Sequence, residues 1–225
     1  TNNPSLVSHV LGGGVMADKP IIFSAPMVRA LLDGRKTQTR RIAAPFAYDR
    51  SPLHPGMKGY RPAPINLWQV DHGGPYFLPR YSVGDRLYVR EAVCWVSRLG
   101  WRYRADDDDL SDNREAGEVG RWHPSIHMPR LASRITLTVT DVRVQRLQDI
   151  SAADSIAEGV QCGTCEFMNT SACNGRGCFA SIAAFQALWN SLHGPGAWEA
   201  NPWVAAYSFT VHRGNIDAIK ETSND

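Results

Sequence analysis

Residues 135–147 alternate apolar and polar side chains along most of their length, which constrains this chain to form a β-sheet. An extended chain places alternate side chains on one face, and the apolar members here are Ile135, Leu137, Val139, Val142 and Val144. The pattern predicts one long strand with room for a bulge. Residues 203–212 predict a second strand near the end of the chain.

The other expected elements are short. Strands are expected at 21–24 and 85–97, and helices at 26–33, from Ser151 onward, and at 182–192. Strands outnumber helices, and their order is mixed instead of a βαβ repeat. We therefore expect an α+β fold, a small and mostly antiparallel β-barrel with peripheral helices and long loop insertions.

The expected helix ends carry local signals. Ser24 can cap the helix at 26–33, and Gly34 supplies the left-handed residue that ends it. Ser151 can cap the next helix, with Asp154 at its third position. In the last helix, Phe185, Trp189 and Leu192 share an apolar face, which predicts a helix packed on the core. His193 fits an ordinary helix-end histidine better than a ligand or an acid.

A basic motif follows Gly34. Residues 35–41 are Arg-Lys-Thr-Gln-Thr-Arg-Arg, and an extended chain would place Thr37, Thr39 and Arg41 on one face. Such a group of Lys, Thr and Arg side chains can hold an anion, polarise a carbonyl or activate a hydroxyl nucleophile. The composition alone is equally typical of a solvated basic turn.

The motif resembles the opening signature of the ASCH domain family, which belongs to the PUA-like superfamily. Residues 84–91, a Gly-Asp turn that leads into a strand, resemble the second signature of the family. Residues 134–148 and then 150–160, a strand and a helix containing Ala-Glu-Gly, resemble the third. Residues 198–204 and the strand after them are similar to members common in phage and prophage genomes.

The resemblance implies a cleft between barrel and helices that binds RNA or a modified nucleoside. Some family members are amidohydrolases that remove an acyl group from the exocyclic amine of a cytosine nucleoside, using a Lys, a Thr and a Glu. Position by position, these catalytic residues fall on Lys36, Thr39 and Glu158. We expect the other side chains of the motif to bind the substrate, and these are Arg35, Thr37, Arg40 and Arg41.

Two alternatives fit the same residues. In the first, the chain is a non-catalytic RNA-binding module, which its Arg-rich motif and aromatic insertions support. In the second, it is a ribonuclease, an activity also reported in the family. Singly, Lys36 also fits a surface charge, Thr39 an ordinary strand residue and Glu158 a carboxylate on a helix surface. The compact amidohydrolases lack the long insertions of this chain, which leaves its substrate open.

Four cysteines form a second cluster in the loop at 161–179, and these are Cys162, Cys165, Cys173 and Cys178. Their spacing suits a tetrahedral structural zinc site, in which four thiolates close the coordination sphere. Free thiols or a disulfide are the alternatives, and the ASCH resemblance does not supply this site. We therefore expect structural zinc and no organic cofactor.

The length of 225 residues fits one domain with insertions. We expect this domain at 16–213, with insertions at 43–80 and 98–130. Residues 1–15 are expected to be a leader or a cloning remnant, and residues 214–225 a frayed tail.

Charge and hydropathy limit the classes of partner that this chain is expected to bind. The net charge of +2 is too small to indicate nucleic-acid binding by itself. No apolar run approaches the roughly eighteen residues of a membrane span. The beginning of the chain lacks the basic region of a secretory signal. We therefore expect a cytoplasmic protein with an RNA or nucleoside ligand and no membrane partner.

Overall fold

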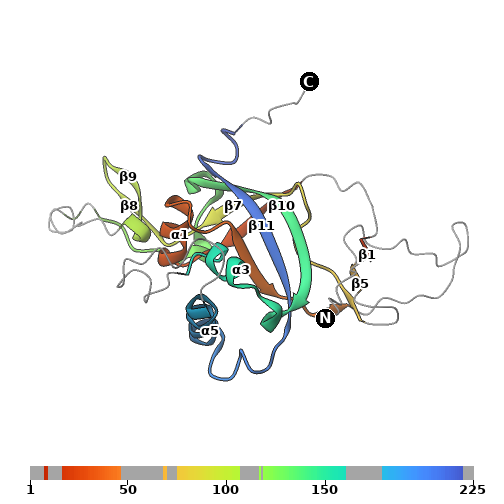
Figure 1. The fold of residues 1–225 in the computed structure, drawn as a ribbon. Coiled ribbons are helices and arrows are strands. Elements are labelled where there is room, and N and C mark those ends of the chain that lie inside the picture. The colour runs from red at the N-terminus through yellow and green to blue at the C-terminus, as the bar shows by residue number, and fades with distance from the viewer. Residues whose placement is uncertain are drawn as a thin grey trace, which may run out of the picture.

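The computed structural model describes residues 8–9, 17–46, 68–69, 75–106, 117, 119–160 and 179–219. Within this part of the chain the fold mixes helices and strands and is built around one five-stranded sheet (Figure 1). This agrees with the expected α+β class.

The central sheet has the strand order β2–β7–β10–β11–β3. Its strands are β2 (Asp18–Ile22), β7 (Arg86–Arg90), β10 (Ile135–Arg146), β11 (Trp203–Arg213) and β3 (Gln38–Ile42). All its pairings are antiparallel except that of β2 with β7, which is parallel. β2 begins and ends before the strand expected at 21–24 would, because its partner β7 pairs with the chain from Asp18 onward.

The ladder between β10 and β11 confirms the predicted long strand and its bulge. Pairing runs from Ile135 opposite Arg213 to Arg146 opposite Trp203, with a register shift between Val139 and Asp141. One extra residue changes the parity of the alternation. The apolar side chains on both sides of the bulge are therefore buried in one core.

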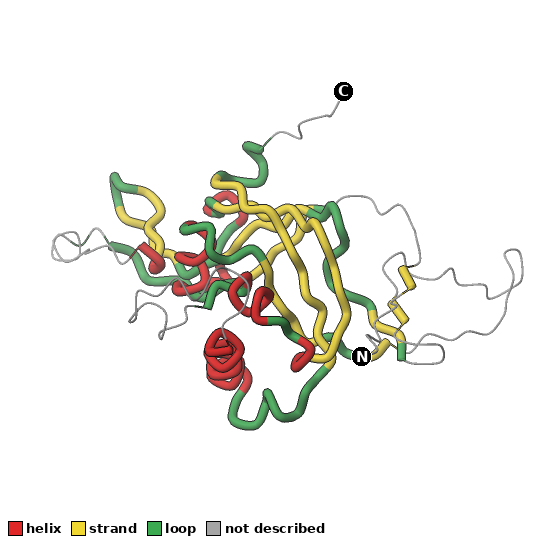
Figure 2. Tube along the Cα trace, in the orientation of Figure 1, coloured by secondary structure: helices red, strands yellow, loops and turns green. Residues whose placement is uncertain are grey.

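β2 and β3 form the two edges of this sheet, and one side chain joins them. Arg41 Nη2 on β3 donates a hydrogen bond of 2.9 Å to the carbonyl oxygen of Ile22 on β2. No backbone ladder connects these two strands within the described ranges. The sheet therefore curves enough to bring its edges within the length of one arginine, and Figure 2 shows its long strands curving together beside the helices.

The main core lies between this sheet and helix α1 (Ala25–Leu32). The helix contributes Val28 and Leu31, and the strands contribute residues such as Leu87, Leu137 and Tyr207. α1 begins where expected, with Ser24 at the N-cap, although the Ser24 side chain makes no capping hydrogen bond. Gly34 follows the helix with φ of 73°, as its role at the helix end requires.

A second cluster joins Phe185 and Trp189 of helix α5 (Phe179–His193) to Leu147, Ile150 and Val204 near the ends of β10 and β11. Helix α3 (Ala152–Ala157) meets α5 through a hydrogen bond between the Ser155 and Ser181 hydroxyls. Ser151 caps α3, since its side chain accepts a 3.0 Å hydrogen bond from the Asp154 amide, as predicted. Phe185 and Trp189 are buried, as predicted for the apolar face of α5. Leu192 is 60% exposed, so the prediction that it packs in the core was wrong.

The single strand expected at 85–97 is two strands. After β7 the chain leaves the sheet and forms β8 (Val93–Val96), which pairs with β9 (Gly100–Tyr103) in a separate hairpin. The break occurs at Glu91, whose buried carboxylate accepts a 2.9 Å hydrogen bond from Arg134. The described residues also form short 3₁₀ helices at Arg104–Asp106, Ser125–His127, Arg130–Ala132 and Leu147–Asp149.

A small sheet has the order β1–β5–β6–β4, and its Trp68 and Phe77 are buried in the main core although it shares no ladder with the central sheet in the described residues. Its strands are β1 (Ser8–His9), β5 (Trp68–Gln69), β6 (Tyr76–Phe77) and β4 (Pro45–Phe46). The segment expected to be a leader thus pairs with the first expected insertion through β1 and β5.

Part of the expected tail packs on the domain. Ile216 is fully buried, and the Asn215 side chain donates hydrogen bonds of 2.9 Å to the carbonyl oxygens of Arg130 and Ser133. Asp217 accepts a 3.0 Å hydrogen bond from Arg130. Residues 214–219 therefore differ from the frayed tail that their polar composition predicted, because one isoleucine and one asparagine attach them.

Ile216 provides a test of this attachment. Ile216→Ala should lower the free energy of unfolding by about 2 to 5 kcal/mol, because it leaves a cavity in a fully buried site. Ile126→Ala is the matched control, since Ile126 is 56% exposed, and its effect should stay within about 0.5 kcal/mol. Urea unfolding measures both. Equal effects would show that residues 214–219 do not pack as described.

Candidate functional site

The segment after Gly34 is held between α1, α3 and β11. The Lys36 amide donates to the carbonyl oxygen of Ala30 at 3.0 Å, and the Thr37 amide donates to that of Ala157 at 2.8 Å. Lys36 also forms an isolated antiparallel bridge with Glu158. The basic motif is therefore fixed by its backbone to the end of α3, where Glu158 is the C-cap residue.

Lys36 and Glu158 form a buried ion pair. Lys36 Nζ lies 2.9 Å from Glu158 Oε2, and it also donates to the Glu158 carbonyl oxygen at 2.8 Å. The two side chains are only 3% and 5% exposed. Burying charges costs several kcal/mol unless they are paired, so this geometry keeps the amine in one place.

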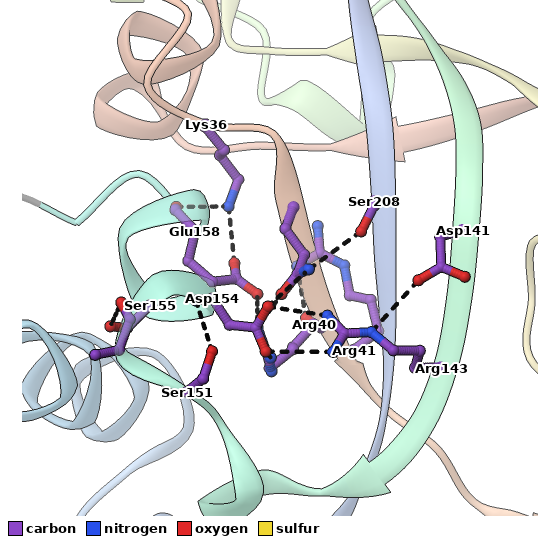
Figure 3. A network of polar contacts seen from close by, with 12 residues as sticks. Lys36, Arg40, Arg41, Asp141, Arg143, Ser151, Asp154, Ser155, Glu158 and Ser208 are labelled. Atoms are coloured by element: carbon purple, nitrogen blue, oxygen red, sulfur yellow. Dashed lines mark hydrogen bonds and ion pairs between the residues drawn. The ribbon is translucent and has the colours of Figure 1, made fainter. Parts of the chain in front are cut away.

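Arg40 connects the same carboxylate to a wider network (Figure 3). Its Nη1 lies 3.0 Å from Glu158 Oε1, and its Nη2 lies 3.0 Å from Asp154 Oδ2. Gln38 accepts a 2.6 Å hydrogen bond from Arg40 Nη1, and Arg143 donates to Asp154 at 2.9 Å. Two guanidinium groups, those of Arg40 and Arg143, thus face two carboxylates.

This balance matters for Lys36. The charges of Arg40, Arg41 and Arg143 compensate those of Asp141, Asp154 and Glu158, so neutral Lys36 leaves the network without net charge. Burial lowers the pKa of Lys36, the Glu158 carboxylate acts in the opposite direction, and the nearby arginines add to the lowering. The pKa of Lys36 therefore lies below its ordinary value, which makes its neutral, basic form more accessible.

Asp154 belongs to the anionic side of this network. Burial opposes its ionisation, but the Arg143 hydrogen bond and the charge of Arg40 outweigh that effect and lower its pKa. The sequence predicted only a capping position for Asp154. Its backbone amide fulfils that position, and its carboxylate holds two arginines.

A small cavity of about 50 Å³ lies beside the ion pair. Lys36, Thr39 and Glu158, the three predicted catalytic residues, all line it. Thr39 is 2% exposed, and its hydroxyl makes no hydrogen bond to any residue that the structure describes. The cavity therefore combines an amine of lowered pKa, a carboxylate and an uncommitted hydroxyl.

The predicted substrate-binding residues separate into two groups. Arg40 and Arg41 line the cavity, and Arg41 lies over the Phe23 ring at 5.3 Å from its centroid. Arg35 is instead paired with Asp33 at 2.8 Å and donates to the Gly159 carbonyl oxygen, and Thr37 is exposed. Neither Arg35 nor Thr37 is among the described residues that line this cavity.

Helix α5 forms one wall of the cavity, a position for this helix that the sequence did not predict. Phe185, Trp189 and His193 line it from this helix. The rings of Trp189 and His193 lie 4.2 Å apart, and partial burial together with the charge of Arg41 lowers the pKa of His193. The apolar spacing of α5 gives its core-facing side, but it carries no information on which strand that side meets.

A wider groove of about 370 Å³ lies next to the cavity, between α1 and α5. Arg29, Asp33 and Arg35 lie along it, and it shares Met27 and Leu188 with the walls of the cavity. Arg35 thus lies at a neighbouring hollow, although it does not reach the ion pair.

The expected zinc ligands Cys162, Cys165, Cys173 and Cys178 lie outside the described residues, so the zinc site stays a prediction. Among the residues that the structure does describe, no three His, Cys, Asp or Glu side chains group as a metal site. None of the described helices combines the length and apolarity needed to span a membrane.

The chain was compared with protein-family models, with curated proteins and with solved structures. No protein-family model, no curated protein and no solved structure matches the chain at a significant level. The functional assignment therefore depends on the site itself and on the resemblance of its motifs.

Gly159 follows Glu158 and is needed for the approach of Lys36. Its φ is 84°, and a Cβ there would lie 2.9 Å from Lys36 Cβ and 3.0 Å from Ala30 Cβ. A side chain at this position would have to displace the backbone that carries the ion pair. The Ala-Glu-Gly segment therefore combines the carboxylate with the one residue type that fits beside it.

Two glycine substitutions test this requirement. Gly34→Ala, at φ of 73° with no atom within 4 Å, should cost about 1 kcal/mol of unfolding free energy through backbone strain alone. Gly159→Ala has similar strain and also clashes, so it should cost about 1 to 3 kcal/mol more. Urea unfolding gives both values. Equal losses would mean that Lys36 does not pack against Gly159.

Proposed function

We propose that this chain is an ASCH-type protein with a PUA-like barrel that hydrolyses an N-acylated cytidine-type nucleoside. The curved five-stranded sheet, with β2 and β3 joined through Arg41, supports the barrel. The three segments that resemble ASCH signatures also meet in space. Residues 34–41 enter β3, residues 84–91 contain β7, and residues 134–160 contain β10 and α3.

One observation carries the hydrolase proposal. Lys36, Thr39 and Glu158 line the same small cavity, although 122 positions separate Lys36 from Glu158 in sequence. A structural ion pair explains the meeting of Lys36 with Glu158, but it leaves the buried Thr39 hydroxyl without a role. A base and a hydroxyl that line one cavity are the two groups with which an enzyme builds an activated nucleophile.

In the first step, neutral Lys36 accepts the proton of the Thr39 hydroxyl while Thr39 Oγ1 bonds to the carbonyl carbon of the acyl group. The electron pair of the carbonyl moves to its oxygen. When the carbonyl re-forms, the bond to the exocyclic nitrogen breaks, and the proton held by Lys36 passes to the leaving amine. The product is the nucleoside with a free amine, and the acyl group remains on Thr39.

In the second step, water attacks the ester on Thr39 and gives its proton to Lys36. The ester breaks, Thr39 regains a proton, and the acyl group leaves as a carboxylic acid. Glu158 holds the Lys36 amine at 2.9 Å in both steps, and Arg40 holds Glu158 from its other oxygen. Glu158 is thus a positioning residue for the base.

The size of the cavity limits what enters it. A volume of about 50 Å³ lies far below the roughly 300 to 1,000 Å³ of pockets that enclose whole drug-sized ligands. A short acyl group fits this space, whereas a nucleoside must remain at its mouth. Arg41, over the Phe23 ring, also lines the cavity, and its exposed guanidinium group can face a base or a phosphate.

Purified protein should convert an N-acylated cytidine to cytidine and the free acid, and mass spectrometry of the products measures this conversion. Lys36→Arg should retain about 1% of turnover or less, because arginine keeps the charge but does not release its proton. Thr39→Ser should keep part of the activity, and Thr39→Val should lose it. Lys36→Arg is expected to stay folded, since arginine can still pair with Glu158.

The controls make the same chemical changes elsewhere. Lys19→Arg alters a lysine paired with Asp85 at 2.6 Å, and Thr37→Val alters an exposed threonine outside the cavity. Both should keep wild-type turnover. Turnover that survives in Lys36→Arg would exclude Lys36 as the base. Absence of turnover on every acylated cytidine, with RNA binding retained, would favour the non-catalytic RNA-binding module.

The rate should depend on pH through Lys36. Its neutral form is the base, so kcat/KM should fall as pH falls through the pKa of Lys36. The charge of Glu158 raises that pKa, and Glu158→Gln should therefore move this limb of the profile to lower pH while lowering the maximal rate. Asp217→Asn, at an exposed carboxylate, should leave the profile unchanged. A limb that moves to higher pH in Glu158→Gln would contradict the assignment.

A further inference from the structure

The groove and the cavity follow one another between helices α1 and α5. Met27 of α1 and Leu188 of α5 line both of them. On α5, Ala184 lines the groove and Leu192 lines the cavity, and these two residues lie about one turn to either side of Leu188. Figure 1 shows both helices on the same side of the long strands β10 and β11. The groove and the cavity are therefore neighbouring parts of one trough.

Two adjacent segments run from the groove to the cavity. Arg35 and Gly159 line the groove, whereas Lys36 and Glu158, their neighbours in sequence, line the cavity. The segments touch, because a Cβ at Gly159 would lie 2.9 Å from Lys36 Cβ. Lys36 donates to the Glu158 carbonyl oxygen at 2.8 Å, and Arg35 donates to that of Gly159 at 3.2 Å. The proposed base is thus one residue away from a residue of the groove.

The two parts of the trough differ in size. The groove measures about 370 Å³, within the roughly 300 to 1,000 Å³ of pockets that hold whole small ligands, and the cavity measures about 50 Å³. Apolar residues contribute much of the groove lining, and these include Pro26, Met27, Val160 and Leu188. Such a space suits a flat nucleobase with its sugar. An acylated nucleoside likewise consists of one large part and one small part.

One carboxylate oxygen at the groove is uncommitted. The Asp33 side chain is 55% exposed, and Arg35 donates to its Oδ2 at 2.8 Å from Nη2 and at 3.3 Å from Nε. Asp33 Oδ1 accepts no hydrogen bond from any residue that the structure describes. The backbone amide of Asp33 caps α1 by donating to the Arg29 carbonyl oxygen at 2.8 Å, which fixes where the carboxylate begins. A carboxylate oxygen that is open to solvent is a strong acceptor for sugar hydroxyls.

We propose that the groove binds the nucleoside of the acylated substrate and that Asp33 accepts a hydrogen bond from the 2′-hydroxyl of its ribose. This assignment rests on the proposed function and narrows its substrate class to ribonucleosides in preference to deoxyribonucleosides. Met27 and Leu188 contact the base where the groove meets the cavity, and the acyl group extends past them to Thr39. Asp33 determines specificity, because it touches the sugar and none of the reacting atoms.

Removal of the 2′-hydroxyl from the substrate tests the role of Asp33. The 2′-deoxy form of an N-acylated cytidine should have a KM about tenfold higher than the ribose form, with kcat unchanged, because one hydrogen bond to a charged acceptor is lost. In Asp33→Ala the two substrates should differ by about twofold or less. Asp217→Ala is the matched control, since Asp217 is also exposed and paired with an arginine, Arg130. It should keep the wild-type preference.

A binding measurement needs no turnover. Cytidine, which lacks the acyl group, should bind with a Kd about tenfold lower than that of deoxycytidine in isothermal titration calorimetry. Ala184→Trp should remove cytidine binding, because Ala184 lines the groove and the larger side chain would occupy it. Ala183→Trp is the matched control. Ala183 is the preceding residue of α5, is exposed and does not line the groove, so the Kd for cytidine should stay as in the wild type.

The outcomes separate the two proposals. Turnover without a preference for ribose, or with the same preference in Asp33→Ala, would overturn the groove assignment while the hydrolase remains. Preferential binding of cytidine that is lost in Asp33→Ala, in a protein without hydrolase activity, would support the groove and remove the proposed reaction. A KM that rises in Arg41→Gln and not in Ala184→Trp would place the nucleoside beside Arg41 and overturn the groove assignment.

Discussion

The carboxylate of Glu158 is the interaction on which the arrangement of the site depends. One of its oxygens pairs with Lys36 and the other with Arg40, and all three side chains are buried. A buried carboxylate without partners would be strongly destabilising, so the end of α3, the turn at Lys36 and strand β3 must meet in one way. The same arrangement sets the environment of Lys36. Because Arg40 also pairs with the Glu158 carboxylate, Lys36 is not the only positive charge that compensates it.

Much of the fold could be predicted from local patterns. The alternation in β10 predicted its length and bulge, and Ser151 and Gly34 marked helix ends, because these signals depend on neighbours in sequence. The juxtaposition of Lys36, Thr39 and Glu158 could not be predicted from such local signals. Sequence patterns place Lys36 and Thr39 in one extended segment and Glu158 at the end of a helix, and only the family resemblance suggested that the three work together.

The rest depended on long-range packing. Arg40 was predicted to bind substrate, and the structure ties its terminal nitrogens to Glu158, Asp154 and Gln38. Asp154 and Glu158 are one helical turn apart, so they project from the same side of α3, and that spacing was a usable signal for a shared cationic partner. No comparable signal connects Trp189 with β3, since the position of α5 is set by how its apolar side meets the end of the sheet.

The two edge strands carry a further consequence, which concerns association between molecules. An exposed sheet edge can pair with a strand of another chain, and charged residues or proline on the edge hinder this. β2 carries Lys19 and Pro20, while β3 carries Arg41, which is exposed. Arg41, beside the cavity, therefore also discourages strand addition. Replacing it with an apolar residue would remove that protection, so colloidal stability and the chemistry of the site both depend on this position.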